Sequence, residues 1–182
     1  MIRQSTFKKR ASWLSNRSIA GVHTGLDGVL DRLRHYRFCD RWHVSGNIET
    51  VAAAMRRPEH IPHWWSCFRH VDIENVGTHH GQDYEFVARI KGIMPYVLKL
   101  TLHIDDVDFP HKFHTFVSGD LIGSGSGRLM QVGNRVQIDF QLDVRVVRRS
   151  LRLMYSFLYP LGFVQHSWVM RTGERGLRKQ ML

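Results

Sequence analysis

The middle of this chain alternates apolar and polar residues in one segment after another. The most regular case runs from Val136 to Val144, where every second residue is apolar and the residues between are polar. Because successive side chains of a β-strand point to opposite faces, this pattern predicts a sheet with one apolar and one wet face. Similar runs, separated by short turns, predict an antiparallel meander; they fall at 71–76, 84–90, 98–104 and in two strands within 113–129.

Another strand and two short helices are predicted ahead of the meander. Asn47 is a residue type that caps helices, and the apolar residues from Ile48 to Met55 follow it at helical spacing. Pro58 stops that helix, and a second short helical turn is expected from Ile61 to Trp65. The first strand has five alternating residues on one face, namely Tyr36, Phe38, Asp40, Trp42 and Val44.

The period of the apolar residues changes after Arg148. From Leu151 to Leu177 they recur every three to four positions, which predicts a C-terminal helix of about 20–30 residues, bent near Pro160. We expect this helix to cover the apolar face of the sheet. The predicted fold is therefore α+β, with a curved antiparallel sheet of six to seven strands wrapped around a long C-terminal helix.

The basic charge of the chain lies at its two ends. The formal net charge is +10, of which residues 1–37 carry +6 and residues 145–182 carry +7. Such ends could meet nucleic acid or anionic lipid. There is no helix-turn-helix spacing, zinc-finger pattern or RNP motif, so we expect no specific nucleic-acid binding. Weak association with an anionic membrane surface stays open, and the sequence does not indicate an oligomeric state.

The Arg- and Ser-rich residues 1–35 are interpreted as a flexible N-terminal extension, with a short helix at Gly25–Arg34, and residues 36–182 as one domain. Two cysteines outside any CxxC pair favour a reducing compartment. No apolar run approaches the roughly 18 residues of a membrane span. We expect a cytoplasmic protein, although the acid-poor, basic start also resembles an organellar transit peptide.

A strongly curved sheet and a single helix tend to leave an apolar cavity between them. Trp64 and Trp65 are expected at its mouth, and Trp168 is an alternative inward residue of the helix. These side chains could equally be plain core. The residues predicted to contact a ligand are Trp64, Trp65, Tyr84, Phe86, Leu98, Leu100, Leu102, Phe140, His166 and Met170.

An ordered set of short motifs resembles the SRPBCC superfamily, the START/Bet v 1-like helix-grip proteins, and within it the polyketide cyclase/dehydrase-like branch. The similarity covers about residues 36–180 and implies a helix-grip fold that holds a small hydrophobic molecule. It lies in Tyr36-Arg37-Phe38, Arg41-Trp42-His43-Val44, the run from Pro58 to Trp65, Pro95-Tyr96, the run from Ser118 to Gly125, His166-Ser167-Trp168-Val169-Met170 and the run from Gly173 to Leu177.

The chain departs from that branch at Gly127, where similar sequences carry a large aromatic residue. The run Gly123–Gly127 is thus built only from Gly and Ser. Either the missing side chain enlarges the cavity, or the glycines mark a tight corner of the sheet. The sequence leaves both interpretations open.

Few residues could supply chemistry in such a cavity. The weak catalytic candidates are Asp120, His166 and Tyr84: an Asp or His could remove a proton next to a carbonyl, and a Tyr could stabilise the enolate. Asp120 could instead cap a turn, and His166 could be a core histidine. The twelve histidines form no convincing ligand set, so neither a metal nor another cofactor is expected.

Three functions are compatible with these sequence features. The first is binding of a small hydrophobic molecule, such as a lipid, an isoprenoid or a polyketide-like compound. The second is catalysis of the cyclase or dehydrase type on such a molecule. The third is a membrane-surface or protein-partner role that uses the basic ends and the amphipathic helix.

Overall fold

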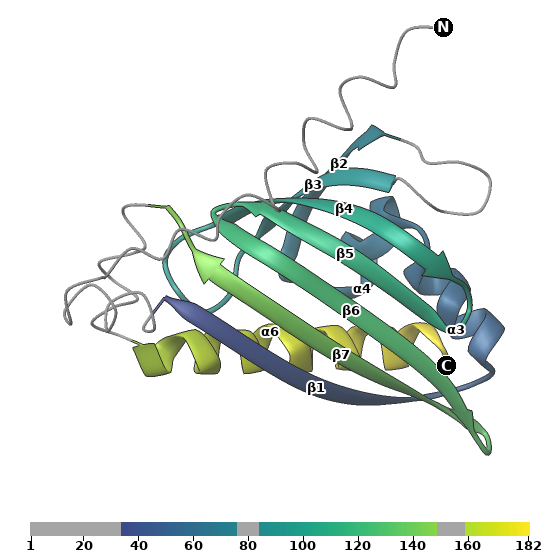
Figure 1. Cartoon of the computed structure of the whole chain (residues 1–182). Helices are drawn as coiled ribbons and strands as arrows, with labels where there is room; N and C mark the ends of the chain where they lie inside the picture. Colours follow the sequence, from purple (N-terminus) through teal and green to yellow (C-terminus); the bar gives the residue numbers. More distant parts are fainter. Residues whose placement is uncertain (1–33, 76–83, 149–158) are drawn as a thin grey trace, which may run out of the picture.

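The computed structural model describes residues 34–75, 84–148 and 159–182. They form a seven-stranded antiparallel sheet that curves around one long helix (Figure 1). The strand order is β1-β7-β6-β5-β4-β3-β2, so β2 to β7 follow one another as a meander and β1 closes onto β7. The predicted fold class is confirmed.

The elements follow the predicted order along the chain. The strands are β1 (His35–Ser45), β2 (Phe68–Asn75), β3 (Tyr84–Ile90), β4 (Leu98–Asp108), β5 (Lys112–Gly119), β6 (Leu121–Val132) and β7 (Arg135–Val146). The helices are α3 (Ile48–Met55), the 3-10 helix η1 (Pro58–His60), α4 (Ile61–Trp64) and α6 (Tyr159–Gln180).

The short helices begin where the sequence predicts. The Asn47 side chain accepts a hydrogen bond from the Thr50 N–H at 2.8 Å, which satisfies one of the free amides at the start of α3. Pro58 then opens η1, a position where its missing N–H costs nothing. Figure 1 shows α3 at one end of the sheet, near the turn between β4 and β5, whereas α4 lies behind the sheet, next to β2 and α6.

The run Gly123–Gly127 places three glycines in a row on the concave face of β6. Their partners in β7 are Val144, Leu142 and Phe140, which alternate on that same face. At Gly123 an added Cβ would lie 1.9 Å from the carbonyl oxygen of Asp143. The strands therefore approach too closely here for any side chain, which supports the tight-corner interpretation.

At Gly127 the neighbouring strand fills the space that a side chain would take. Phe113 is the direct cross-strand partner of Gly127. Its ring lies so close that an added Cβ would be 2.3 Å from Phe113 Cε1. Extra cavity volume at Gly127 is therefore wrong as an interpretation, because an aromatic ring from β5 occupies that space.

Helix α6 approaches the rest of the protein closely through its own glycines. An added Cβ on Gly176 would lie 1.5 Å from the carbonyl oxygen of Trp64. The helix also covers the free edge of β1: Glu174 accepts the His43 N–H at 3.1 Å, and Arg178 donates to the His43 carbonyl at 2.7 Å. These contacts occupy polar groups that would otherwise offer a pairing edge.

Several predictions lie outside the described residues. They include the short helix at Gly25–Arg34, most of the N-terminal extension and the predicted helical stretch from Leu151 to Leu158. The bend near Pro160 is therefore not tested, and Pro160 stands second in α6. Within the described ranges, no helix combines the length and hydrophobicity needed to cross a membrane.

Candidate functional site

Two adjoining cavities lie between the sheet and α6. The first, of about 210 Å³, extends toward α3 and the β4–β5 turn, and the second, of about 190 Å³, extends toward the beginning of α6. Their walls are mostly aliphatic and aromatic, as in sites that hold apolar small molecules. Six residues line both cavities, namely Trp65, Phe68, Leu102, Leu142, His166 and Met170.

All ten residues predicted to contact a ligand stand in these walls. For the six of them that lie on strands, the reason is the strand register, which puts alternate side chains of β3, β4 and β7 on the concave face. Whether they touch a ligand stays a prediction. Trp64, Tyr84, Phe86 and Phe140 line the first cavity, Leu98 and Leu100 the second, and Trp65, Leu102, His166 and Met170 both.

Of the three tryptophans, Trp64 and Trp168 differ from their predicted places. Trp64 is buried, with 7% of its surface exposed. It therefore forms part of the cavity wall and does not lie at the mouth of the cavity. Trp65 is held by a hydrogen bond of 2.8 Å from its Nε1 to the carbonyl oxygen of Val169. Trp168 is 37% exposed and lines neither cavity. The helical period alone did not distinguish the inward from the outward face at Trp168.

Asp120 lies away from both cavities. Its Oδ2 accepts hydrogen bonds from the Lys99 N–H at 2.9 Å and from Arg148 at 3.2 Å. It follows Gly119, whose φ of +107° turns the chain between β5 and β6. Asp120 thus caps a turn, which was the alternative interpretation, and its placement in the cavity as a catalytic candidate is wrong.

His166 occupies the shared wall and forms a hydrogen bond with Asp40. Its Nε2 lies 2.6 Å from Asp40 Oδ2, and the ionised carboxylate can only accept. The imidazole also stacks on Phe38, with ring centroids 3.7 Å apart and planes 9° from parallel. Side-chain exposures of 14% for His166 and 24% for Asp40 show that water reaches the pair only in part.

Asp40 was not among the residues that the sequence singled out as functional. The signal was present, because Asp40 alternates with Phe38 and Trp42 on the apolar face of β1. A carboxylate at such a position needs a partner. Its partner is 126 residues away on α6, so only the tertiary fold identifies it.

Two further polar groups stand in the wall of the first cavity. Thr115 Oγ1 donates to the His103 carbonyl at 3.1 Å, so it already has a partner. Trp64 Nε1 is buried and has no hydrogen-bond partner within the described structure. An unpaired buried N–H is costly, and a ligand carbonyl or hydroxyl is one way to satisfy it.

The structure also describes the buried thiol and the arrangement of residues of metal-binding type. Burial raises the pKa of the Cys67 thiol to about 11, so Cys67 is protonated and unreactive at neutral pH. Among the residues that the structure describes, no three His, Cys, Asp or Glu side chains group as metal ligands do.

No protein-family profile and no characterised protein sequence matches the chain. Solved structures do match it. The chain has the helix-grip fold. The Zhui aromatase/cyclase from Streptomyces sp. R1128 superposes with a TM-score of 0.67 at 9% identity, over 81% of this chain and 93% of that one. A START superfamily protein from Mycobacterium smegmatis gives 0.61 at 13% identity, over 80% and 99%.

The helix-grip fold is thus common to this chain and to proteins of different kinds. The major latex-like protein 151 from Panax ginseng superposes with a TM-score of 0.53 at 12% identity, over 77% of this chain and 95% of that one. The predicted resemblance to START/Bet v 1-like and polyketide cyclase-like folds is confirmed at the level of the fold. Identities this low leave the function to be argued from the site.

Proposed function

We propose that this protein binds a small hydrophobic molecule, of lipid, isoprenoid or polyketide-like chemistry, in the two cavities beneath α6. The observation that carries the proposal is the composition of the walls. Aromatic and aliphatic side chains dominate, and the interior polar pair, Asp40 and His166, is already hydrogen bonded. An apolar ligand would gain about 25 cal/mol for each Å² of its surface removed from water.

The test is a search for what the purified full chain carries. Native mass spectrometry followed by solvent extraction is expected to reveal an apolar small molecule, and added ligand is expected to raise the Tm. Leu102→Trp should abolish the shift, because Leu102 lines both cavities. The matched control is Ile122→Trp on the outer face, where Ile122 is 45% exposed. Equal ligand-induced shifts in both variants would refute the proposed cavity.

Catalysis on such a ligand is the second candidate, and the His166–Asp40 pair favours it. A neutral imidazole can take a proton from a carbon next to a carbonyl, while a carboxylate fixes its orientation. Tyr84 lines the first cavity from β3 and would hydrogen-bond the enolate. Asp40→Asn and His166→Gln should then stop cyclisation of a polyketide substrate without stopping its binding. Unchanged turnover in both variants would exclude this candidate.

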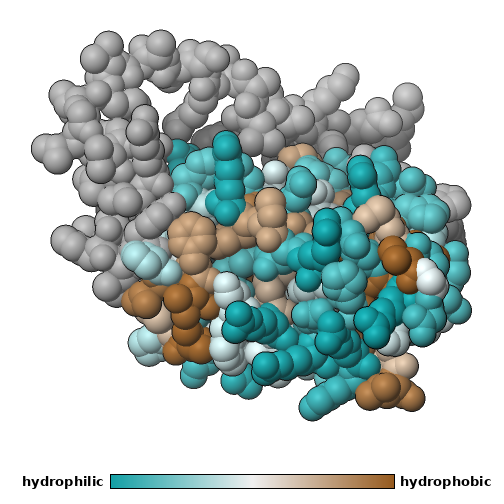
Figure 2. Space-filling model, turned by 90° about the horizontal axis from the view of Figure 1, so that it is seen from below, coloured by the Kyte–Doolittle hydropathy of each residue, from teal (hydrophilic) through white to brown (hydrophobic). Residues whose placement is uncertain are grey.

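The membrane-surface or partner role stays a prediction. Of the two basic ends that motivate it, the N-terminal one falls almost entirely outside the described residues, whereas most of the C-terminal one lies in β7 and α6. Figure 2 views the molecule from below and shows a mostly hydrophilic surface interrupted by hydrophobic patches, and α6 exposes Phe163, Val164 and Trp168. If the role is real, binding to vesicles with anionic lipid should weaken as salt rises; absence of binding at low salt would reject it.

A further inference from the structure

The outward face of α6 is apolar in its first half and basic in its second half. Its exposed residues recur every three to four positions and so form one stripe along the helix. In the first half, Val164 is 51% exposed and Trp168 is 37% exposed. The stripe then continues with four exposed cations, namely Arg171, Arg175, Arg178 and Lys179.

The opposite face of the same helix lines the cavities. Gly162, His166 and Val169 all stand in the wall of the second cavity. No residue of the outward stripe lines either of the two cavities described above. The composition of the stripe is therefore not explained by the proposed ligand site, and exposed apolar side chains beside a polar region mark interaction surfaces.

Exposed apolar side chains also stand on both flanks of the first half of α6. On one flank, the Met94 N–H donates to Gln165 Oε1 at 3.2 Å, which holds the loop between β3 and β4 against the helix. Ile93, in that loop, is 49% exposed. On the other flank, the Phe163 ring packs 5.4 Å from the Phe38 ring and is still 38% exposed.

The acidic groups next to the basic half are few and already bonded. Glu174 is the one acid in the sequence of α6. It accepts hydrogen bonds from the His43 N–H at 3.1 Å and from Arg178 at 2.6 Å. The helix packs on β1 and α4, whose sequences contain one acid, Asp40, and that carboxylate is bonded to His166.

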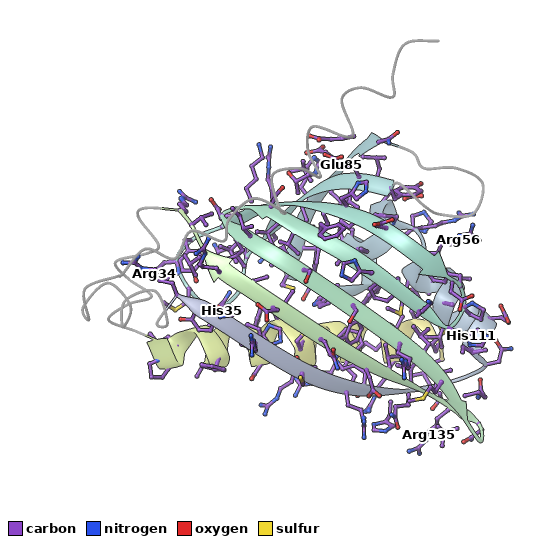
Figure 3. The ribbon with its side chains drawn as sticks, in the orientation of Figure 1. Arg34, His35, Arg56, Glu85, His111 and Arg135 are labelled. Carbon is purple, nitrogen blue, oxygen red and sulfur yellow. The ribbon has the colours of Figure 1, made fainter. Side chains whose placement is uncertain are left out.

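More distant acids do not reverse the charge of this half. Glu59 is exposed in η1, just ahead of α4. Set against Glu59 and Glu174, the four cations of the stripe leave a net charge of +2. Asp139 and Asp143 pair with arginines of β1. Figure 3 shows Glu85 at the upper edge of the molecule, whereas α6 runs along its lower edge.

An anionic bilayer surface supplies partners for both halves of the stripe. Lipid phosphates attract the cations, and the layer beneath the head groups accepts apolar side chains, with tryptophan favoured at that boundary. A soluble polyanion would meet the cations and leave Val164 and Trp168 in water. In Figure 2 a hydrophobic patch lies on the left, the side where α6 begins, and hydrophilic side chains fill the middle.

We propose that the outward face of α6 docks on an anionic membrane surface, with its apolar half among the head groups and its four cations on lipid phosphates. This inference rests on the membrane-surface candidate above and gives it a defined surface. It does not depend on what the cavities hold.

The first test measures binding of the full chain to phosphatidylcholine vesicles with and without phosphatidylglycerol, at low salt. We expect binding to the anionic vesicles. Arg171→Gln with Arg175→Gln should weaken it about 25-fold, because each cation near such a surface contributes about fivefold. The matched control is Arg89→Gln with Lys99→Gln. It removes the same charge from a cross-strand pair on the convex face and should bind as the wild type does.

The second test asks whether the apolar half enters the head groups. Brominated phospholipid in the anionic vesicles quenches the fluorescence of a tryptophan that reaches the bilayer. We expect quenching in the wild type. Trp168→Phe should lose most of that quenching and keep the binding, because a phenyl ring replaces the indole.

The outcomes separate this inference from both earlier proposals. Unchanged binding in the Arg171 and Arg175 variant, or an equal loss in the control, would overturn the role of α6 and leave the membrane candidate standing. Undiminished quenching in Trp168→Phe would also overturn it. Binding to poly-glutamate but to no vesicle would reject the membrane and identify an acidic protein partner. Leu102→Trp, which fills the cavities, should bind vesicles like the wild type; a loss there would tie docking to the ligand and overturn the independence claimed here.

Discussion

His166 Nε2 donates to Asp40 Oδ2 across 2.6 Å and so joins α6 to β1 within the cavity wall. Removing one partner leaves a partly buried polar group unsatisfied, so we expect Asp40→Ala and His166→Ala each to destabilise by about 1–3 kcal/mol. In the double variant the losses should be less than additive, since the second change removes the orphaned group. Urea unfolding of the four proteins measures the coupling, and strict additivity would show that the pair is not energetically linked.

Gly176 allows α6 to touch the backbone of α4. An alanine there gains about 1 kcal/mol of helix propensity. Its Cβ would, however, clash with the Trp64 carbonyl oxygen at a distance of 1.5 Å. That oxygen belongs to the backbone, which cannot move aside as the end of a side chain can. We expect Gly176→Ala to lower the free energy of unfolding by about 1–3 kcal/mol. Ser167→Ala, at an exposed position of α6, is the control and should be near neutral; stabilisation by Gly176→Ala would contradict the close contact.

Phe113 and Gly127 share one space on the concave face. Gly127→Phe alone should destabilise, because the Phe113 ring lies 2.3 Å from the required Cβ. Phe113→Gly alone should also destabilise, by loss of a packed ring. The exchanged pair, Phe113→Gly with Gly127→Phe, should recover at least about 1 kcal/mol relative to the sum of the single changes. Thermal denaturation of all four proteins tests this, and no recovery would mean that the ring position depends on β5 itself.

The two cysteines should react at different rates with a thiol reagent. Cys39 is exposed, whereas Cys67 is buried and its burial raises the thiol pKa to about 11. A reagent such as Ellman's at pH 8 should therefore modify one thiol quickly in the native protein and the second only on unfolding. Cys39→Ser should remove the fast phase. A fast phase that survives in Cys39→Ser would show that Cys67 is accessible.

The outer face of β1 and β7 predicts a pH dependence of stability. The hydrogen bond from Arg41 lowers the pKa of Asp139 below its usual value. A carboxyl whose pKa is lower in the folded state stabilises the protein above its unfolded pKa, near 4, and loses that contribution as pH falls through the folded value. Arg41→Gln should therefore lower the Tm slightly at pH 7. The difference in Tm between the wild type and this variant should disappear below about pH 4.

The effect should be small, because Asp139 and Arg41 are both partly exposed to solvent, with side-chain exposures of 27% and 59%. The control is Arg135→Gln, which replaces an exposed arginine at the start of β7. Its difference in Tm from the wild type should not depend on pH. If the difference in Tm between the wild type and Arg41→Gln stayed constant across pH, the Arg41–Asp139 ion pair would contribute nothing to stability.

Much of the fold could be predicted because its signals are local. Alternation at Val136–Val144, the Asn47 cap and the helical period around His166 each reflect constraints within a few residues. Such constraints are imposed by the backbone, so they are visible in the chain itself. The concave face followed from the same alternation, and with it the six predicted wall residues that lie on strands.

The sequence by itself determined the strands, the helices and which side chains share a face. Only the tertiary structure decided which of those side chains meet. In the folded protein Asp40 pairs with His166, and the Phe113 ring lies over Gly127. Asp120 lies in a turn and not in the cavity, and Arg56 lies against Phe109. Each of these depends on how far strands bend and how closely α6 approaches them. Those distances are set by packing between segments remote in sequence, and no local pattern records them.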